Sequence, residues 1–67
     1  MKAKLKLLGR CTNLTDSTTF VRIYRDTENQ EYVLKLTIKG EYKEDCDYFT
    51  TDIDDADATA QRMVNGN

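Results

Sequence analysis

The fold is decided by the stretch Tyr32-Val33-Leu34-Lys35-Leu36-Thr37-Ile38-Lys39. The side chains of Tyr32, Leu34, Leu36 and Ile38 alternate in it with those of Val33, Lys35, Thr37 and Lys39. Such alternation is typical of a β-strand with one face on a core and the other face toward water. Near Thr51 the period changes to that of a helix, and the apolar positions become Ile53, Ala56, Ala60, Met63 and Val64. The change of period predicts a small sheet followed by one helix.

Other segments of the chain carry strand patterns, and polar or glycine-containing turns separate them. The predicted strands are residues 2–8, 18–26, 31–39 and 42–50. Gly9 marks either the end of the first strand or a bulge within it, and Asn29 is expected to adopt a left-handed conformation in the turn 26–30. Because consecutive strands joined by short turns pair with each other, the predicted fold is α+β. It is a four-stranded antiparallel meander sheet with one C-terminal helix packed on one face.

The helix is expected to begin in an aspartate-rich run, residues 51–55, and to end at Asn65-Gly66. Carboxylates in the first turn accept hydrogen bonds from free amide groups and are stabilised by the positive end of the helix dipole. Ala56 and Ala60 are small enough to let the helix lie close to the sheet. The side chains expected beneath it are Leu5, Leu7, Val21, Ile23, Leu34, Leu36 and Ile38.

The length and composition predict one small domain, residues 1–67, with neither a disulfide nor a structural metal to stabilise it. Cys11 and Cys46 are far apart in sequence, and the chain has no histidine, so the ligands of a structural zinc site are lacking. No signal-like or membrane-spanning apolar run is present. We therefore expect a cytoplasmic protein with free cysteines, no membrane segment and no metal.

The residues that carry chemistry in enzymes do not form a recognisable set. The run from Asp52 to Met63 lacks the glycine and the final glutamate of a calcium loop. A serine or cysteine nucleophile would lack a histidine base, and Gly9, Gly40 and Gly66 do not form a phosphate loop. The sequence predicts no catalytic residue and no cofactor, so the protein is not expected to be an enzyme.

Charge is divided unevenly along the chain. Residues 1–43 carry nine basic and five acidic side chains, whereas residues 44–67 carry one basic and seven acidic side chains, and the total is −2. If the aliphatic row of each strand points at the helix, the pleat sends a basic and aromatic set to the other face. This predicted binding face consists of Lys4, Lys6, Phe20, Arg22, Tyr24, Val33, Lys35 and Lys39.

Three interpretations of this face remain open. Its apolar members favour contact with a protein, either a second copy in a homodimer or a host protein. Its cations and rings resemble the platforms that bind single-stranded nucleic acid, although an isoelectric point near 4.9 argues against tight binding of this kind. The third interpretation is a solvated face lined by long Lys and Arg stems.

The stretch Asp45-Cys46-Asp47-Tyr48-Phe49-Thr50-Thr51-Asp52 resembles a pattern in short uncharacterised proteins of tailed phages, particularly marine ones. The resemblance extends over nearly the whole chain, including Val21-x-x-Tyr24-x-Asp26. The family pattern has alanine where this chain has Cys46, which suggests that this small residue points into the core. The resemblance implies a viral accessory protein made in a bacterial host, and it implies no activity and no site residues.

Overall fold

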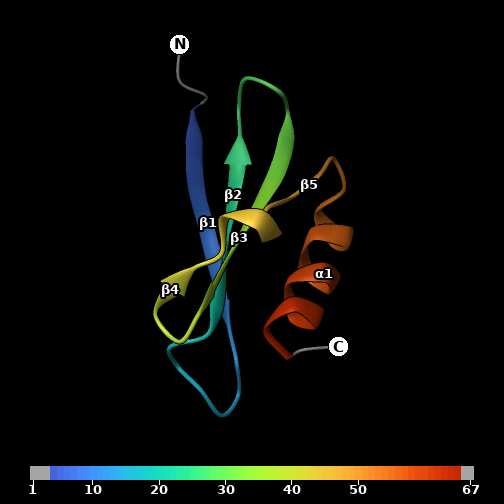
Figure 1. Ribbon diagram of the computed structural model, residues 1–67. Helices are drawn as coiled ribbons and strands as arrows, with labels where there is room; N and C mark the ends of the chain where they lie inside the picture. Colours follow the sequence, from blue (N-terminus) through green and yellow to red (C-terminus); the bar gives the residue numbers. More distant parts are fainter. Residues whose placement is uncertain (1–3, 66–67) are drawn as a thin grey trace.

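The computed structural model describes residues 4–65, which form one antiparallel sheet with a helix on one of its faces (Figure 1). The elements are β1 (Leu5–Thr12), β2 (Phe20–Asp26), β3 (Glu31–Ile38), β4 (Glu41–Tyr42), the 3₁₀ turn η1 (Glu44–Cys46), β5 (Tyr48–Thr50) and α1 (Ile53–Asn65). The strands lie in the order β1-β2-β3-β4, and β5 also pairs with β3. The predicted α+β meander with a C-terminal helix is confirmed.

The predicted fourth strand is interrupted. Tyr42 of β4 pairs with Thr37, and Tyr48 of β5 pairs with Leu34. Residues 43–47, which contain η1, lie between the two short strands and do not pair with β3 in the ladder. Four of these five residues are charged, and acidic residues in particular disfavour a strand. Cys46 lies in η1 and is exposed, so the expectation that it points into the core is wrong.

A β-bulge reverses the two faces of the first half of β1. Leu7 pairs with Tyr24, but Gly9 pairs with Ile23, so β1 has one residue more than β2 at this point. Paired residues share a face, and Leu5 and Leu7 therefore lie on the face away from α1, not beneath it as predicted. Gly9 thus belongs to a bulge within the strand.

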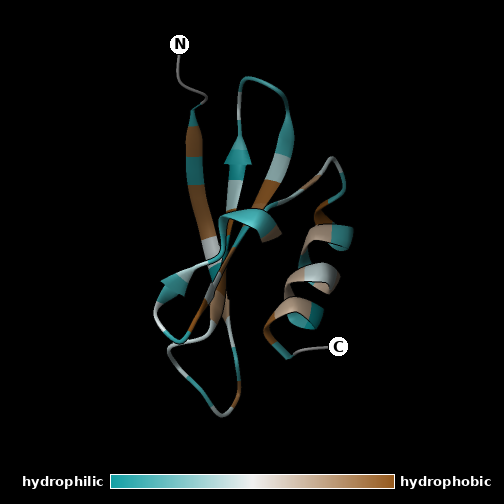
Figure 2. Cartoon of the chain, viewed as in Figure 1, coloured by the Kyte–Doolittle hydropathy of each residue, from teal (hydrophilic) through white to brown (hydrophobic). Residues whose placement is uncertain are grey.

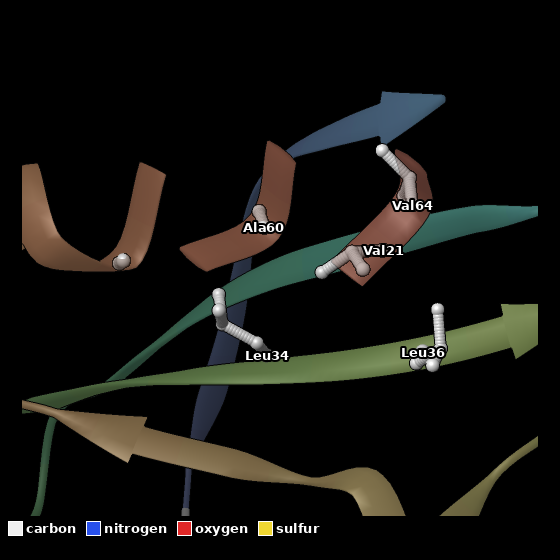
Figure 3. Close-up of a cluster of buried hydrophobic side chains, with 6 residues drawn as sticks. Val21, Leu34, Leu36, Ala60 and Val64 are labelled. Atoms are coloured by element: carbon white, nitrogen blue, oxygen red, sulfur yellow. The ribbon is translucent and has the colours of Figure 1, made fainter. Parts of the chain in front are cut away.

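The core lies between the sheet and α1 (Figure 3). Val21, Leu34 and Leu36 point from the strands toward the helix, where Ala56, Ala60 and Val64 complete the buried cluster. The predicted direction of Leu34 and Leu36 is therefore confirmed. Two predicted core residues lie at the margin instead: Ile53 and Ile38 are 45 % and 37 % exposed, because Ile53 begins the helix and Ile38 ends its strand.

Both ends of α1 are fixed by side chains. Asp52 caps the N-terminus, accepting a hydrogen bond from the amide of Asp54 at 2.9 Å. Asn13, in the loop after β1, donates to the carbonyl of Val64 at 2.6 Å near the other end. Gly66, expected as the stop signal, lies outside the described residues.

A hydrogen bond also joins β5 to the first turn of α1. The Tyr48 hydroxyl donates to Asp55 at 2.7 Å, which raises the pKa of the phenol and lowers the pKa of the carboxyl.

The two hairpin turns of the meander contain the non-glycine residues with positive φ. In the β2–β3 turn it is Gln30 that adopts this conformation, with φ of 53°, so the prediction for Asn29 is wrong. The Asn29 amide side chain donates to Asp26 instead, at 2.9 Å. In the β3–β4 turn both Lys39 (φ 51°) and Gly40 (φ 80°) are left-handed, as a type I′ turn requires.

Replacing Lys39 by asparagine is expected to stabilise the protein by up to about 1 kcal/mol, since asparagine tolerates the left-handed region better than lysine. The backbone amide that donates to Thr19 is retained in this variant. Urea titration followed by circular dichroism measures the change. Lys39→Ala is the control, because it removes the charge without relieving the backbone. An equal gain in stability in both variants would mean that removal of the lysine side chain causes it. That result would contradict an explanation based on the left-handed backbone conformation.

Candidate functional site

Residues 4–65 enclose no pocket or cleft, and the candidate site is the surface of the sheet that α1 leaves uncovered. We call it the open face. Strand register and the Lys35 contacts place on it Leu5, Leu7, Arg10, Thr12, Phe20, Arg22, Tyr24, Asp26, Glu31, Val33, Lys35, Thr37, Tyr42, Asp47 and Phe49.

An apolar ridge crosses the open face at right angles to the strands. It runs from Leu7 through Tyr24 and Val33 to Phe49, each residue directly opposite the next on the neighbouring strand. Its two ends are exposed, Leu7 to 55 % and Phe49 to 56 %, whereas Val33 is only 2 % exposed. In Figure 2 hydrophobic colour also marks β1 well away from α1. The ridge therefore offers two accessible apolar side chains about the width of the sheet apart.

A row of cations lies beside the ridge. Arg10 is opposite Arg22, and Arg22 is opposite Lys35, an arrangement in which like charges repel. Each cation lies over a ring: Arg10 is 5.0 Å from the centroid of Phe20, and Arg22 is 5.9 Å from that of Tyr24. Among residues 4–65 neither arginine is ion-paired with a carboxylate, and the Nε of Arg22 is buried without a hydrogen-bond partner.

Lys35, by contrast, has its charge balanced within the chain. Its Nζ lies 3.2 Å from a carboxylate oxygen of Asp47 and donates to the hydroxyl of Tyr42, which in turn donates to Asp47 at 2.7 Å. Partial burial alone would lower the pKa of Lys35, but the bonds to Tyr42 and Asp47 outweigh it and raise that pKa. The hydrogen bond to Asp47, with burial, raises the pKa of Tyr42. At neutral pH the lysine of this cluster is therefore charged and the tyrosine is neutral.

Charge is therefore distributed unevenly along this row of the open face. The β1 end carries Arg10 without a carboxylate partner. At the opposite end of the row lies Asp47, which is paired with Lys35, and the exposed Glu44 and Asp45 precede it in η1. One end of the face is cationic and the other is anionic.

The structure brings together part of the predicted face. Phe20, Arg22, Tyr24 and Lys35 do share it, and Val33 lies on it but is covered by its neighbours.

The predicted place of Lys4 and Lys6 on the open face is wrong. Lys6 lies opposite Arg25 on the helix side, and Lys4, two residues before it, follows the same alternation. Lys39 lies in the β3–β4 turn, outside the strand. The bulge moves Lys4 and Lys6 to the helix side and places Leu5 and Leu7 on the open face. Arg10 follows the bulge and lies on this face because β1 continues to Thr12.

The remaining reactive side chains do not gather into a second site. Burial, with a smaller contribution from Asp57, raises the pKa of the Cys11 thiol, which keeps it protonated at neutral pH. No three Cys, Asp or Glu side chains in the described part of the chain are grouped to hold a metal ion. Nor does any helix between residues 4 and 65 combine the length and apolar character needed to cross a bilayer.

No family model matches the chain, and it has no match among curated proteins or solved structures.

Proposed function

We propose that the protein acts without catalysis, as an accessory protein that binds another protein through the open face. The observation that carries this proposal is the ridge, with Leu7 and Phe49 each more than half exposed. Beside it lie two arginines that have no carboxylate partner within residues 4–65. Contiguous exposed apolar area marks interaction sites, and Leu5 and Tyr42, which are 40 % and 39 % exposed, extend the apolar area of this face beside Leu7 and Phe49. The resemblance to short tailed-phage proteins is consistent with such a role in the cytoplasm of a bacterial host.

The composition of the face supports a protein partner more than a nucleic acid. Protein interfaces are enriched in tyrosine, phenylalanine and arginine and depleted in lysine. The bulge removes Lys4 and Lys6 from the face and adds Leu5 and Leu7, and the continuation of β1 to Thr12 adds Arg10. The open face therefore has fewer lysines and more apolar side chains than predicted. Lys35 is already neutralised by Asp47, so few cations are left to contact phosphates.

Single-stranded nucleic acid remains the second candidate because Arg10 and Arg22 have no carboxylate partner among residues 4–65. Against it, these guanidinium groups lie over Phe20 and Tyr24, the rings on which bases would stack. Fluorescence anisotropy with labelled oligothymidylate at low salt tests this candidate. Binding that weakens steeply with salt and disappears in Arg10→Glu would support it. A flat titration up to high micromolar protein would remove it.

Photo-crosslinking tests the proposed protein contact. The photoreactive amino acid p-benzoylphenylalanine replaces Phe49 on the open face or, as a matched control, Ala58, which is exposed on α1. We expect discrete protein adducts from position 49, either in purified protein or in bacterial lysate, and none from position 58. A nuclease-sensitive adduct would favour the second candidate. Absence of adducts from position 49 in both samples would contradict a contact through this face.

A further inference from the structure

We propose that the partner of the open face is the open face of a second copy, related to the first by a two-fold axis parallel to the strands. This inference rests on the protein-contact function proposed above and names its partner. Two sheets packed face to face lie about 10 Å apart, a space that side chains from both sheets fill. A two-fold contact uses the same surface of both copies, so that surface must be complementary to itself.

The ridge meets this requirement because its residues are ordered across the sheet. With the axis parallel to the strands, the β1 side of one copy lies over the β5 side of the other, and β2 lies over β3. Leu7 then faces Phe49 of the second copy, and Tyr24 faces Val33 of the second copy. The two most exposed ends of the ridge cover each other, and this occurs twice by symmetry.

The charges select the same orientation. Arg10, at the cationic end, faces the β5 end of the second copy, where Asp47 is already paired with Lys35 of its own chain and the exposed Glu44 and Asp45 of η1 precede it. A two-fold axis perpendicular to the strands, along the row, would instead place Arg10 against Arg10 of the second copy, and like charges would meet.

One contact in this arrangement joins two cations. Arg22 lies opposite Lys35 of the second copy, but Asp47 lies 3.2 Å from the Nζ of Lys35 within its own chain and offsets its charge. The repulsion is therefore smaller than that of two unpaired cations. In this arrangement cations meet only where Arg22 lies opposite Lys35 of the second copy. At both ends of the row a cation faces acidic side chains.

A pair of complementary variants tests the arrangement. Leu7→Arg and Phe49→Glu change exposed side chains, and neither removes a hydrogen bond or ion pair of the folded chain, so both should fold as judged by circular dichroism. Leu14→Arg is the matched control, since Leu14 is 92 % exposed in the β1–β2 loop, outside the open face. Sedimentation velocity and light scattering across protein concentration measure association of each chain and of mixtures.

We expect the unaltered protein and Leu14→Arg to dimerise alike, and each open-face variant alone to dimerise at least tenfold more weakly. Mixing Leu7→Arg with Phe49→Glu should restore a one-to-one dimer, because arginine at position 7 then faces glutamate at position 49. Weakening without rescue would overturn this orientation of the axis. An unchanged dimer in both variants would place the interface elsewhere and also overturn it. A strict monomer that still forms Phe49-position adducts with other proteins would overturn self-pairing and leave the proposed function standing.

Discussion

Replacing Leu34 by alanine is expected to leave the protein largely unfolded. Leu34 is fully buried and belongs to the same core cluster as Ala56 and Ala60 of α1, and Figure 3 shows its side chain directed from the strand toward the helix. Truncating a buried leucine costs about 2–5 kcal/mol, the sum of lost transfer energy and the cavity left behind. A single-core domain of this size gains only roughly 3–5 kcal/mol on folding. The loss is therefore comparable to the whole free energy of unfolding.

The control for this substitution makes the same chemical change at an exposed site. Leu14→Ala removes the same atoms from a side chain that is 92 % exposed, and we expect its free energy of unfolding to stay within about 0.5 kcal/mol of the unaltered value. Urea denaturation of the three proteins, followed by circular dichroism, gives the comparison. A Leu34→Ala variant as stable as Leu14→Ala would mean that the sheet and helix do not share this core.

The sequence predicted the architecture well because its strongest signals are repeated over many residues. The alternation around Leu34 and Leu36 and the helical spacing of Ala56, Ala60 and Val64 each depend on several side chains that bury the same face. The errors occur where one residue changes the geometry. Residues 43–47 break the fourth strand, and the left-handed position falls on Gln30, whereas the side chain of Asn29 donates to Asp26.

The open face was predicted less completely than the core, and one extra residue explains most of the difference. A strand side chain changes face with every position, so the bulge at Leu7 and Gly9 exchanged lysines for leucines on the open face. Gly9 was a signal of this possibility, but a bulge and a strand end are equally compatible with a glycine. Phe49 and Tyr42 were missed because their side depends on the interruption by η1, which only the pairing with β3 reveals.

Replacing Ala60 by leucine is expected to destabilise the protein by about 1–3 kcal/mol, although leucine is nearly as good a helix former as alanine. Ala60 is fully buried against the strands, and the added atoms would force α1 away from Val21 and Leu34. Ala58→Leu is the matched control: it makes the same change on the exposed side of α1 and should shift the stability by no more than about 0.5 kcal/mol. In a domain of this size about 4–8 °C in Tm accompanies each kcal/mol, so thermal unfolding separates the two variants clearly. Equal midpoints for both would show that α1 does not need a small residue against the sheet.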